Sequence, residues 1–423
     1  MTNLLMIGKL KKIICLAVLT LVYLIVIKPE LTIASEEHEE EFELTSMPGV
    51  TYRIKKNGVE REAVLNLDIE GWERNEAYSN GLIIPEIIEH DGEEYLVTEL
   101  TDDNGHIYIS GLSKVEFPAT IKKISARNIT IEGYSIPIIF RCSSEAFSDV
   151  QHIGLDESAI ESIIYCPDNE LEEYKNLMDK ICKVTFYDTE DFHRSYCGLA
   201  VAKIGEENVI PLAFHADSGY YKILNSKKKT VALICADFNT TYMEGIYEQP
   251  GTVSYRGNKY HVTQIEYFAF HMSRCGIKLP STVKKLSTEC FGQHVKMVDL
   301  SETKIKKIKK NLFLDYGDND SSEPEVAEVI LPESCTDIER KAFYRCKKLQ
   351  SITIPSNVKT IGYKAFYKKC KNYYILGDIL PKGINRQYMK SSIVYVKSDL
   401  IDEAKEILKD KIKMGRCTVE KLK

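Results

Sequence analysis

A short phrase that recurs with small variations constrains the fold of this chain more than any other feature of its 423 residues. In each copy an aliphatic residue stands five positions before a phenylalanine, and successive phenylalanines are 21, 22, 30 and 23 residues apart. The five pairs are Ile265–Phe270, Leu286–Phe291, Ile308–Phe313, Ile338–Phe343 and Ile361–Phe366. Because units of this size bury their apolar side chains only by stacking on their neighbours, the period predicts a repeat solenoid, which offers an extended surface rather than a pocket.

The segment between two such phrases fits a short strand. It carries the pattern apolar-x-x-apolar-x-apolar, whose last two positions alternate as in a strand with one buried face, and a proline often follows. Proline donates no ladder hydrogen bond, so it ends the strand and turns the chain. A polar insertion, Asp315–Glu325, explains the 30-residue spacing, and we expect it to be a surface loop. Period and pattern together predict an α/β-type solenoid of leucine-rich repeats with short parallel strands.

Two repeats resemble a known family. The segments SITIPSNVKTIGYKAFYKKC (Ser351–Cys370) and VILPESCTDIERKAFYRC (Val329–Cys346) resemble the BspA-like leucine-rich repeats of bacterial surface proteins, with their recurring IP-x-x-V-x-x-I-G-x-x-A-F-x-x-C. Residues 277–313 are weaker copies, and the N-terminal half departs further, although it keeps Ala146 and Phe147. The resemblance implies a protein that is secreted or displayed on a cell surface and that adheres to ligands on host or neighbouring cells.

Longer segments also repeat, and they set the expected number of modules. The stretch YRIKKNGVEREAVLNLDI is echoed by YKILNSKKKTVALICADF, and HDGEEYLVTEL is echoed by YRGNKYHVTQI. Each pair begins a small β segment that leads into repeats. Ile163–Tyr187 and Ile393–Cys417 also correspond, each with a strand and then an amphipathic helix that we expect to cap the open end of a solenoid. We therefore predict two tandem modules, residues 44–190 and 195–423, which the chain length also favours.

The N-terminus has the layout of a secretory signal peptide, with three lysines before an apolar run and small residues after it. We predict a signal peptide over residues 1–35, an acidic spacer over residues 36–43, and export to the cell surface or the medium. The alternative is a membrane anchor formed by Ile13–Ile27, although its 15 residues fall short of the roughly 20 that span a bilayer. In that case only this segment contacts the membrane.

Charge and cysteine content limit the classes of partner. A net charge of −6 argues against nucleic-acid binding, and the basic run Lys304–Lys310 has apolar residues at core positions, so its lysines fit a solvated face. Of the 12 cysteines, 11 remain without Cys15 of the predicted signal peptide. Cys346 and Cys370 occupy equivalent repeat positions, so we expect mostly free, buried thiols, with disulfides between stacked turns as the alternative.

The sequence contains no recognisable catalytic or metal motif, because HExxH, GxSxG, GxGxxG, CxxC and the Walker loop are all missing. Two cysteines have a histidine four residues away, Cys197 with His193 and Cys290 with His294, but neither pair has a recognisable third member. The insertion lacks the glycine and the terminal glutamate at the spacing of a calcium-binding loop, and the carboxylates of the spacer fit a solvated, flexible terminus rather than an ion site. We therefore predict no enzyme activity, no metal site and no cofactor.

The remaining candidate site is the exposed face of the strands. In each strand pattern the residue between the last two apolar positions points away from the core, because side chains alternate along a strand. The displayed row is Glu116, Lys278, Asp299, Ile330 and Thr353, with Gly154 in the N-terminal half. We predict that this face binds a protein or glycan ligand on host or neighbouring cells. The alternative is a structural or assembly protein of the cell envelope without a soluble ligand.

Overall fold

The computed structural model describes residues 41–44, 47, 50–55, 61–67, 81–102, 104–187, 193–216, 219–237, 244–313 and 324–423. The predicted signal peptide and most of the Asp315–Glu325 insertion lie outside these residues. The last two residues of the predicted spacer, Phe42–Glu43, form strand β1 and pair with β2. No helix within the described ranges is long and apolar enough to cross a membrane.

The first sheet has six strands and combines antiparallel hairpins with parallel pairs. Its order is β1-β2-β3-β6-β5, and β9 also pairs with β6. Strands β3 and β6 run parallel with a bulge, since Ala63 pairs with Val97 and Val64 pairs with Glu99, which leaves Thr98 unmatched. The strands are β1 (Phe42–Glu43), β2 (Thr51–Lys55), β3 (Glu62–Asn66), β5 (Ile87–His90), β6 (Glu93–Thr101) and β9 (Lys123–Ser125).

Two five-stranded sheets follow, and short parallel strands make up most of each. One has the order β15-β14-β12-β10-β7 and the other β16-β13-β11-β8-β4. Helix α2 (Leu171–Ile181) connects β13 to β14 and buries Tyr174, Met178 and Ile181. The sheet that includes β15 contains β7 (His106–Ser110), β10 (Asn128–Glu132), β12 (His152–Leu155), β14 (Cys182–Tyr187) and β15 (His193–Cys197). The sheet that includes β16 contains β4 (Leu82–Ile83), β8 (Val115–Phe117), β11 (Pro137–Phe140), β13 (Ile163–Cys166) and β16 (Ala200–Lys203).

A second six-stranded mixed sheet has the plan of the first. Its order is β17-β18-β19-β22-β21, and β24 pairs with β22 as β9 pairs with β6. The bulge recurs as well, because Val231 pairs with Val262 and Ala232 with Gln264, which leaves Thr263 unmatched. The strands are β17 (Ala213–Ala216), β18 (Gly219–Asn225), β19 (Thr230–Ala236), β21 (Thr252–Tyr255), β22 (Asn258–Ile265) and β24 (Lys285–Leu286).

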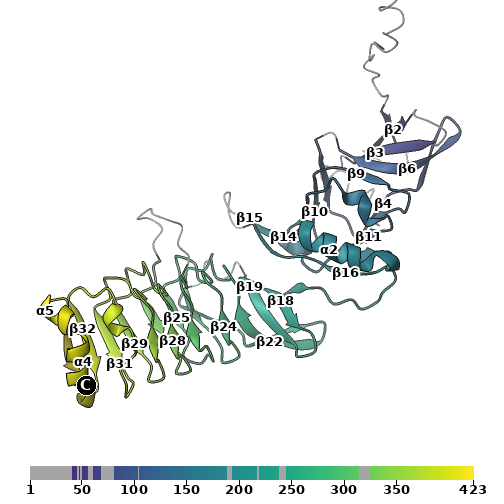
Figure 1. Ribbon diagram of the computed structural model, residues 1–423. Coiled ribbons are helices and arrows are strands. Elements are labelled where there is room, and N and C mark those ends of the chain that lie inside the picture. Colours follow the sequence, from purple (N-terminus) through teal and green to yellow (C-terminus); the bar gives the residue numbers. More distant parts are fainter. Residues whose placement is uncertain are drawn as a thin grey trace, which may run out of the picture.

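The C-terminal repeats add three parallel sheets, and Figure 1 shows the strands from β18 to β32 stacked in a row that ends at α4 and α5. The first sheet contains β20 (Ile246–Glu248), β23 (Gly276–Lys278), β25 (Met297–Asp299) and β27 (Glu328–Ile330). The second contains β26 (Lys307–Ile308), β28 (Asp337–Ile338) and β30 (Thr360–Ile361). The third contains β29 (Ser351–Ile354), β31 (Asn372–Ile375), β32 (Ser392–Val396) and β33 (Cys417–Lys421). The predicted leucine-rich-repeat fold, with many short parallel strands, is confirmed.

The core of these repeats contains a column of phenylalanine rings. Neighbouring ring centroids are 5.7, 5.5, 6.4 and 5.4 Å apart along the column. Every ring is at most 4 % exposed, and so is each aliphatic partner five positions earlier, which confirms the core predicted from the recurring phrase. We call these five residues the phenylalanine column: Phe270, Phe291, Phe313, Phe343 and Phe366.

One backbone position in each repeat has a left-handed conformation. The residue two positions before each ring of the phenylalanine column has a φ between 48° and 61°, although none of the five is glycine. These residues are Phe268, Glu289, Asn311, Lys341 and Lys364. Because the left-handed region disfavours residues with a Cβ, each stacked repeat holds a strained residue at the same place.

Cysteines and helices agree with the sequence in part. No disulfide joins the ten cysteines whose side chains the structure describes, and all ten are buried except the half-buried Cys235. This confirms the expectation of free, buried thiols over disulfides for these ten. The predicted C-terminal helix is instead two short helices, α4 (Ile401–Ile407) and α5 (Lys409–Lys413), which meet at Leu408.

Candidate functional site

Parallel pairing aligns the predicted display residues of the C-terminal repeats into a row. Lys278 in β23 pairs with Asp299 in β25, and Asp299 pairs with Ile330 in β27. Thr353 in β29 pairs with Tyr374 in β31, and Tyr374 pairs with Tyr395 in β32. The alternation of exposed and buried residues in these strands places the row on the outer side of the sheets.

A hollow of about 640 Å³ opens in this face where one sheet ends and the next begins. Strand β27 is the edge of one four-stranded sheet and β29 is the edge of the next. Ile330, Thr353 and Tyr374 line the hollow together with polar groups such as Ser301 and Glu333. We call these five residues the strand-face hollow. An apolar surface with a few polar groups at its edge is typical of a binding site.

The other two predicted residues of the C-terminal row already have partners within the chain. Lys278 Nζ lies 3.0 Å from Glu302 Oε1 and 3.4 Å from Glu248 Oε1. The hydrogen bond with Glu302 and the charge of Glu248 raise the pKa of Lys278. Asp299 Oδ1 accepts a hydrogen bond from the Ser301 N–H at 2.8 Å. These contacts give Lys278 and Asp299 a local structural role beside the strand-face hollow.

Glu116 does not fit the prediction of a displayed ligand-binding residue. It lies in β8, in the N-terminal half, and is only 9 % exposed. Its carboxylate accepts a hydrogen bond from Arg141 Nε at 2.5 Å and also pairs with Lys114. Burial raises the pKa of Glu116, but hydrogen bonds from Lys114 and Arg141 outweigh burial, so the net pKa is lowered. Glu116 is therefore a buried partner for two cations.

Two tyrosines of this face were missing from the predicted row. Tyr374 and Tyr395 continue it beyond Thr353, and their rings stack with centroids 4.7 Å apart and planes 6° apart. The segments NYYIL and IVYV do carry alternation between buried and exposed positions. They lack the proline that follows several of the other strands. The alternation alone was therefore the signal that could have identified them.

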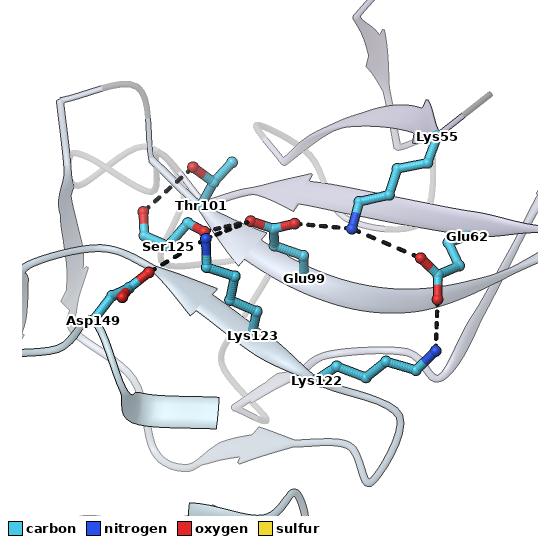
Figure 2. Close-up of polar contacts among 8 residues, drawn as sticks. All are labelled: Lys55, Glu62, Glu99, Thr101, Lys122, Lys123, Ser125 and Asp149. Carbon is cyan, nitrogen blue, oxygen red and sulfur yellow. Dashed lines mark hydrogen bonds and ion pairs between the residues drawn. The ribbon is translucent and has the colours of Figure 1, made fainter. Parts of the chain in front are cut away.

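The N-terminal sheet presents a cluster of charges that is a second candidate for a polar site. Figure 2 shows the carboxylates of Glu62 and Glu99 between the ammonium groups of Lys55, Lys122 and Lys123. Lys55 Nζ lies 2.9 Å from Glu99 Oε2, and Lys122 Nζ lies 2.6 Å from Glu62 Oε1. The charges of the cluster compensate one another across β2, β3, β6 and β9. We interpret it as a stabilising network rather than a binding site.

Of the two cysteine–histidine pairs noted in the sequence, the structure describes the side chains of Cys290 and His294, and these do not form a nucleophilic site. Cys290 is fully buried, and burial raises the pKa of its thiol well above the usual range. His294 contacts Gln293 and Glu325, so its ring is engaged elsewhere. The side chains of His193 and Cys197 lie outside what the structure describes. Among the described residues, no group of three His, Cys, Asp or Glu side chains is placed to hold a metal ion.

Comparison with family models identifies the repeats. Residues 257–374 match the BspA type leucine-rich repeat region in six copies. This confirms the resemblance drawn from the repeat sequences, and the matching model describes a repeat rather than a catalytic domain. No curated protein matches the chain.

Solved structures of low sequence identity also match. A leucine-rich cell surface protein of Faecalibacterium prausnitzii is 14 % identical, with 81 % of this chain and 97 % of that chain covered and a TM-score of 0.31. A leucine-rich repeat protein of Bacteroides ovatus is 14 % identical, with 88 % and 98 % covered and a TM-score of 0.32. The pneumococcal vaccine antigen PcpA is 13 % identical, with 91 % and 99 % covered and a TM-score of 0.30.

Proposed function

We propose that this chain, whose residues 257–374 are BspA-type leucine-rich repeats, is an exported binding protein that recognises a protein or glycan ligand on host or neighbouring cells. The strand-face hollow is the observation that carries the proposal. Ile330 is 37 % exposed there although it is a large apolar side chain, and its neighbours include the hydroxyl groups of Thr353 and Tyr374. Exposed apolar surface beside hydroxyl groups favours the binding of a ligand over a purely structural role.

The shape of the repeat region supports recognition of an extended ligand. The row from Lys278 to Tyr395 runs across successive strands, and strands in a sheet lie about 4.8 Å apart. A ligand on this face therefore contacts several repeats at once, as is typical of solenoid proteins. Lys278 and Asp299 then contribute to binding indirectly. The ion pairs of Lys278 and the turn contact of Asp299 hold the strands of the row in place.

We further propose that the chain consists of two tandem modules with cap helices, predicted as residues 44–190 and 195–423. Strands β15 and β16 pair with β14 and β13, so the sheets of the first module extend to Lys203. Two observations support this division. The two six-stranded sheets have the same strand order and the same bulge, with Thr98 and Thr263 at equivalent places. Helix α2 lies between β13 and β14, and α4 and α5 lie between β32 and β33, so the same order of strand, helix and strand recurs near the end of both segments.

Export is proposed from the N-terminal sequence alone. The basic end, the apolar run and the small residues of residues 1–35 favour cleavage by a signal peptidase. The alternative is retention at the membrane by Ile13–Ile27. Mass spectrometry of the mature N-terminus distinguishes the two, because a chain that begins near residue 35 has lost this segment and one that keeps Met1 has not.

The binding proposal is tested by measuring the purified full chain against an array of matrix proteins, glycans and cell-envelope fractions. We expect a saturable ligand whose binding is lost in Ile330→Arg and Thr353→Arg, because arginine fills the strand-face hollow and adds charge. Ile379→Arg is the matched control, since Ile379 is 77 % exposed outside the hollow. No binding by the folded full chain, or equal loss in the control, would contradict the proposal and favour an envelope-assembly role.

A further inference from the structure

Residues 340–398 concentrate positive charge in a chain that is acidic overall. The segment contains fourteen lysine and arginine residues and a single acidic residue, Asp378, whereas the whole chain has a net charge of −6. The carboxylate of Asp378 pairs with Lys397. Charge of one sign gathered in one region attracts ligands of the opposite sign.

Three lysines of this segment lie over tyrosine rings, with the ammonium nitrogen 4.9 to 5.5 Å from the ring centroid. In the described part of the chain no carboxylate pairs with these three ammonium groups. Their positive charge is therefore available to a ligand. The pairs are Lys341 with Tyr344, Lys364 with Tyr363 and Tyr388, and Lys368 with Tyr367, and we call these seven residues the Tyr–Lys surface.

The repeat places these side chains at a regular spacing. Lys341 and Lys364 are the left-handed residues two positions before Phe343 and Phe366, with φ values of 57° and 51°. The Lys341 N–H donates a hydrogen bond to the backbone oxygen of Tyr363 at 3.3 Å, which links one repeat to the next. Stacking of the phenylalanine column therefore presents a lysine at the same place in both repeats.

A hollow of about 300 Å³ lies within the Tyr–Lys surface. Tyr344 and Tyr388 at its edge are 40 % and 51 % exposed, and the buried ring of Phe366 contributes to its lining. The hollow shares no lining residue with the strand-face hollow. The ring of Tyr373 packs against Phe366, whereas the next residue, Tyr374, lines the strand-face hollow. The two hollows are thus separate sites.

We propose that the Tyr–Lys surface binds a polyanionic glycan, a chain of sugar rings that carry sulfate or carboxylate groups. Tyrosine rings offer apolar faces on which sugar rings pack, and the phenolic hydroxyl groups bond to sugar hydroxyl groups. The lysine ammonium groups pair with the acidic substituents, and two successive repeats match successive units of a polymer. This inference goes beyond the proposed strand-face function and does not depend on it.

Charge density favours a glycan over a nucleic acid as the occupant. Duplex DNA carries one negative charge per about 1.7 Å of its axis, so its binding requires many cations along a continuous surface. A glycan with a few charges on each sugar needs only the lysines of neighbouring repeats. Tyr344 and Tyr367 also meet edge to face, at 79°, rather than forming a parallel platform for stacked bases.

The proposal is tested by fluorescence polarisation with the full chain and labelled oligosaccharides. The probes are a heparin octasaccharide, which is sulfated, and a hyaluronan octasaccharide, which carries carboxylates only. We expect at least one of them to bind with an affinity that falls as salt rises, and the comparison between them identifies the acidic group. The double variant Lys364→Gln/Lys368→Gln should weaken this binding about tenfold, and Tyr388→Ala should weaken it several-fold.

The matched control is Lys227→Gln/Lys228→Gln, which removes the same charge from exposed lysines in the turn between β18 and β19. We expect this control and Ile330→Arg to leave glycan affinity within about twofold, and thermal unfolding shows whether each variant is folded. Equal loss in the Lys227/Lys228 control, equal binding of a neutral maltooctaose, or tighter binding of an oligothymidylate would overturn the proposal. Loss of glycan binding in Ile330→Arg would place the ligand in the strand-face hollow instead.

Discussion

Phe343 and Phe366 lie one repeat apart, and their rings are 5.4 Å apart between centroids and only 7° from parallel. Their backbones also form a parallel bridge, so the two rings and the two chains stack together. Each ring is at most 1 % exposed. An isolated repeat cannot bury such a ring. The contact between the two repeats therefore stabilises the folded chain.

Phe366→Ala should therefore lower the free energy of unfolding by ~3–5 kcal/mol, because it removes a buried ring and leaves a cavity beside Phe343. Urea denaturation followed by circular dichroism measures the change. Tyr134→Ala is the control, since Tyr134 is 87 % exposed and its loss should cost under about 0.5 kcal/mol. A cost below ~1 kcal/mol for Phe366→Ala would show that Phe366 is not part of the core.

The left-handed residue two positions before each ring of the phenylalanine column leads to a prediction in which glycine is more stable than alanine. Glu289 has a φ of 52°, a conformation that costs a residue with a Cβ roughly 1–2 kcal/mol. Glu289→Gly removes this cost, although glycine also gains freedom in the unfolded chain. We expect Glu289→Gly to be more stable than Glu289→Ala by about 1 kcal/mol, as measured by urea denaturation. Alanine is the matched control because both variants remove the same charge, and a more stable alanine variant would contradict the strain.

The charge network of Figure 2 predicts a dependence of stability on pH. Burial raises the pKa of Glu99, but hydrogen bonds from Ser125 and Lys55 outweigh burial and lower the net pKa below 4.5. A carboxyl whose pKa is lower in the folded state stabilises the fold above its unfolded pKa and loses this contribution as pH falls through its folded pKa. Glu99→Gln should therefore cost about 1–2 kcal/mol at pH 7 and progressively less below pH ~4.5.

This pH prediction is checked by urea denaturation of the native chain and Glu99→Gln at several pH values. The difference between the two isolates Glu99 from the other carboxyl groups that titrate in the same range. Glu403→Gln, at an exposed position in α4, is the control and should show a small difference at every pH. A Glu99→Gln cost that stays constant from pH 7 to pH 3 would argue against the network.

The phenylalanine column and the strands of the best repeats could be predicted, because both depend only on a period within the sequence. The burial of Glu116 could not be predicted. It depends on a hydrogen bond from Arg141, which follows a different strand, β11. The strand-face hollow could not be predicted either. It lies where the sheet that ends at β27 meets the sheet that begins at β29, and no local pattern in the sequence marks this boundary. For the Tyr–Lys surface the sequence held a signal, the missing acidic residues between 340 and 377, that the net charge of the whole chain concealed.

A contact between distant segments gives the last prediction. Glu161 accepts a hydrogen bond from the Tyr255 hydroxyl at 2.6 Å and one from the His215 N–H at 3.3 Å. The Tyr255 ring also stacks on Phe214, with centroids 4.2 Å apart. Because Glu161 and Tyr255 belong to the two proposed modules, this contact would fix one module on the other.

A double-mutant cycle with Glu161→Ala and Tyr255→Phe measures this contact, since it separates the pair from other effects of each change. We expect a coupling of roughly 0.5–1.5 kcal/mol in the free energy of unfolding. A parallel cycle that replaces Glu161→Ala by Glu172→Ala, at an exposed position in α2, should give no coupling. Small-angle X-ray scattering of Glu161→Ala should show a larger radius of gyration than the native chain. Zero coupling with unchanged scattering would mean that the two segments are held together by their apolar contacts, such as Ala213 and Ile234 in the core of the N-terminal half, rather than by Glu161.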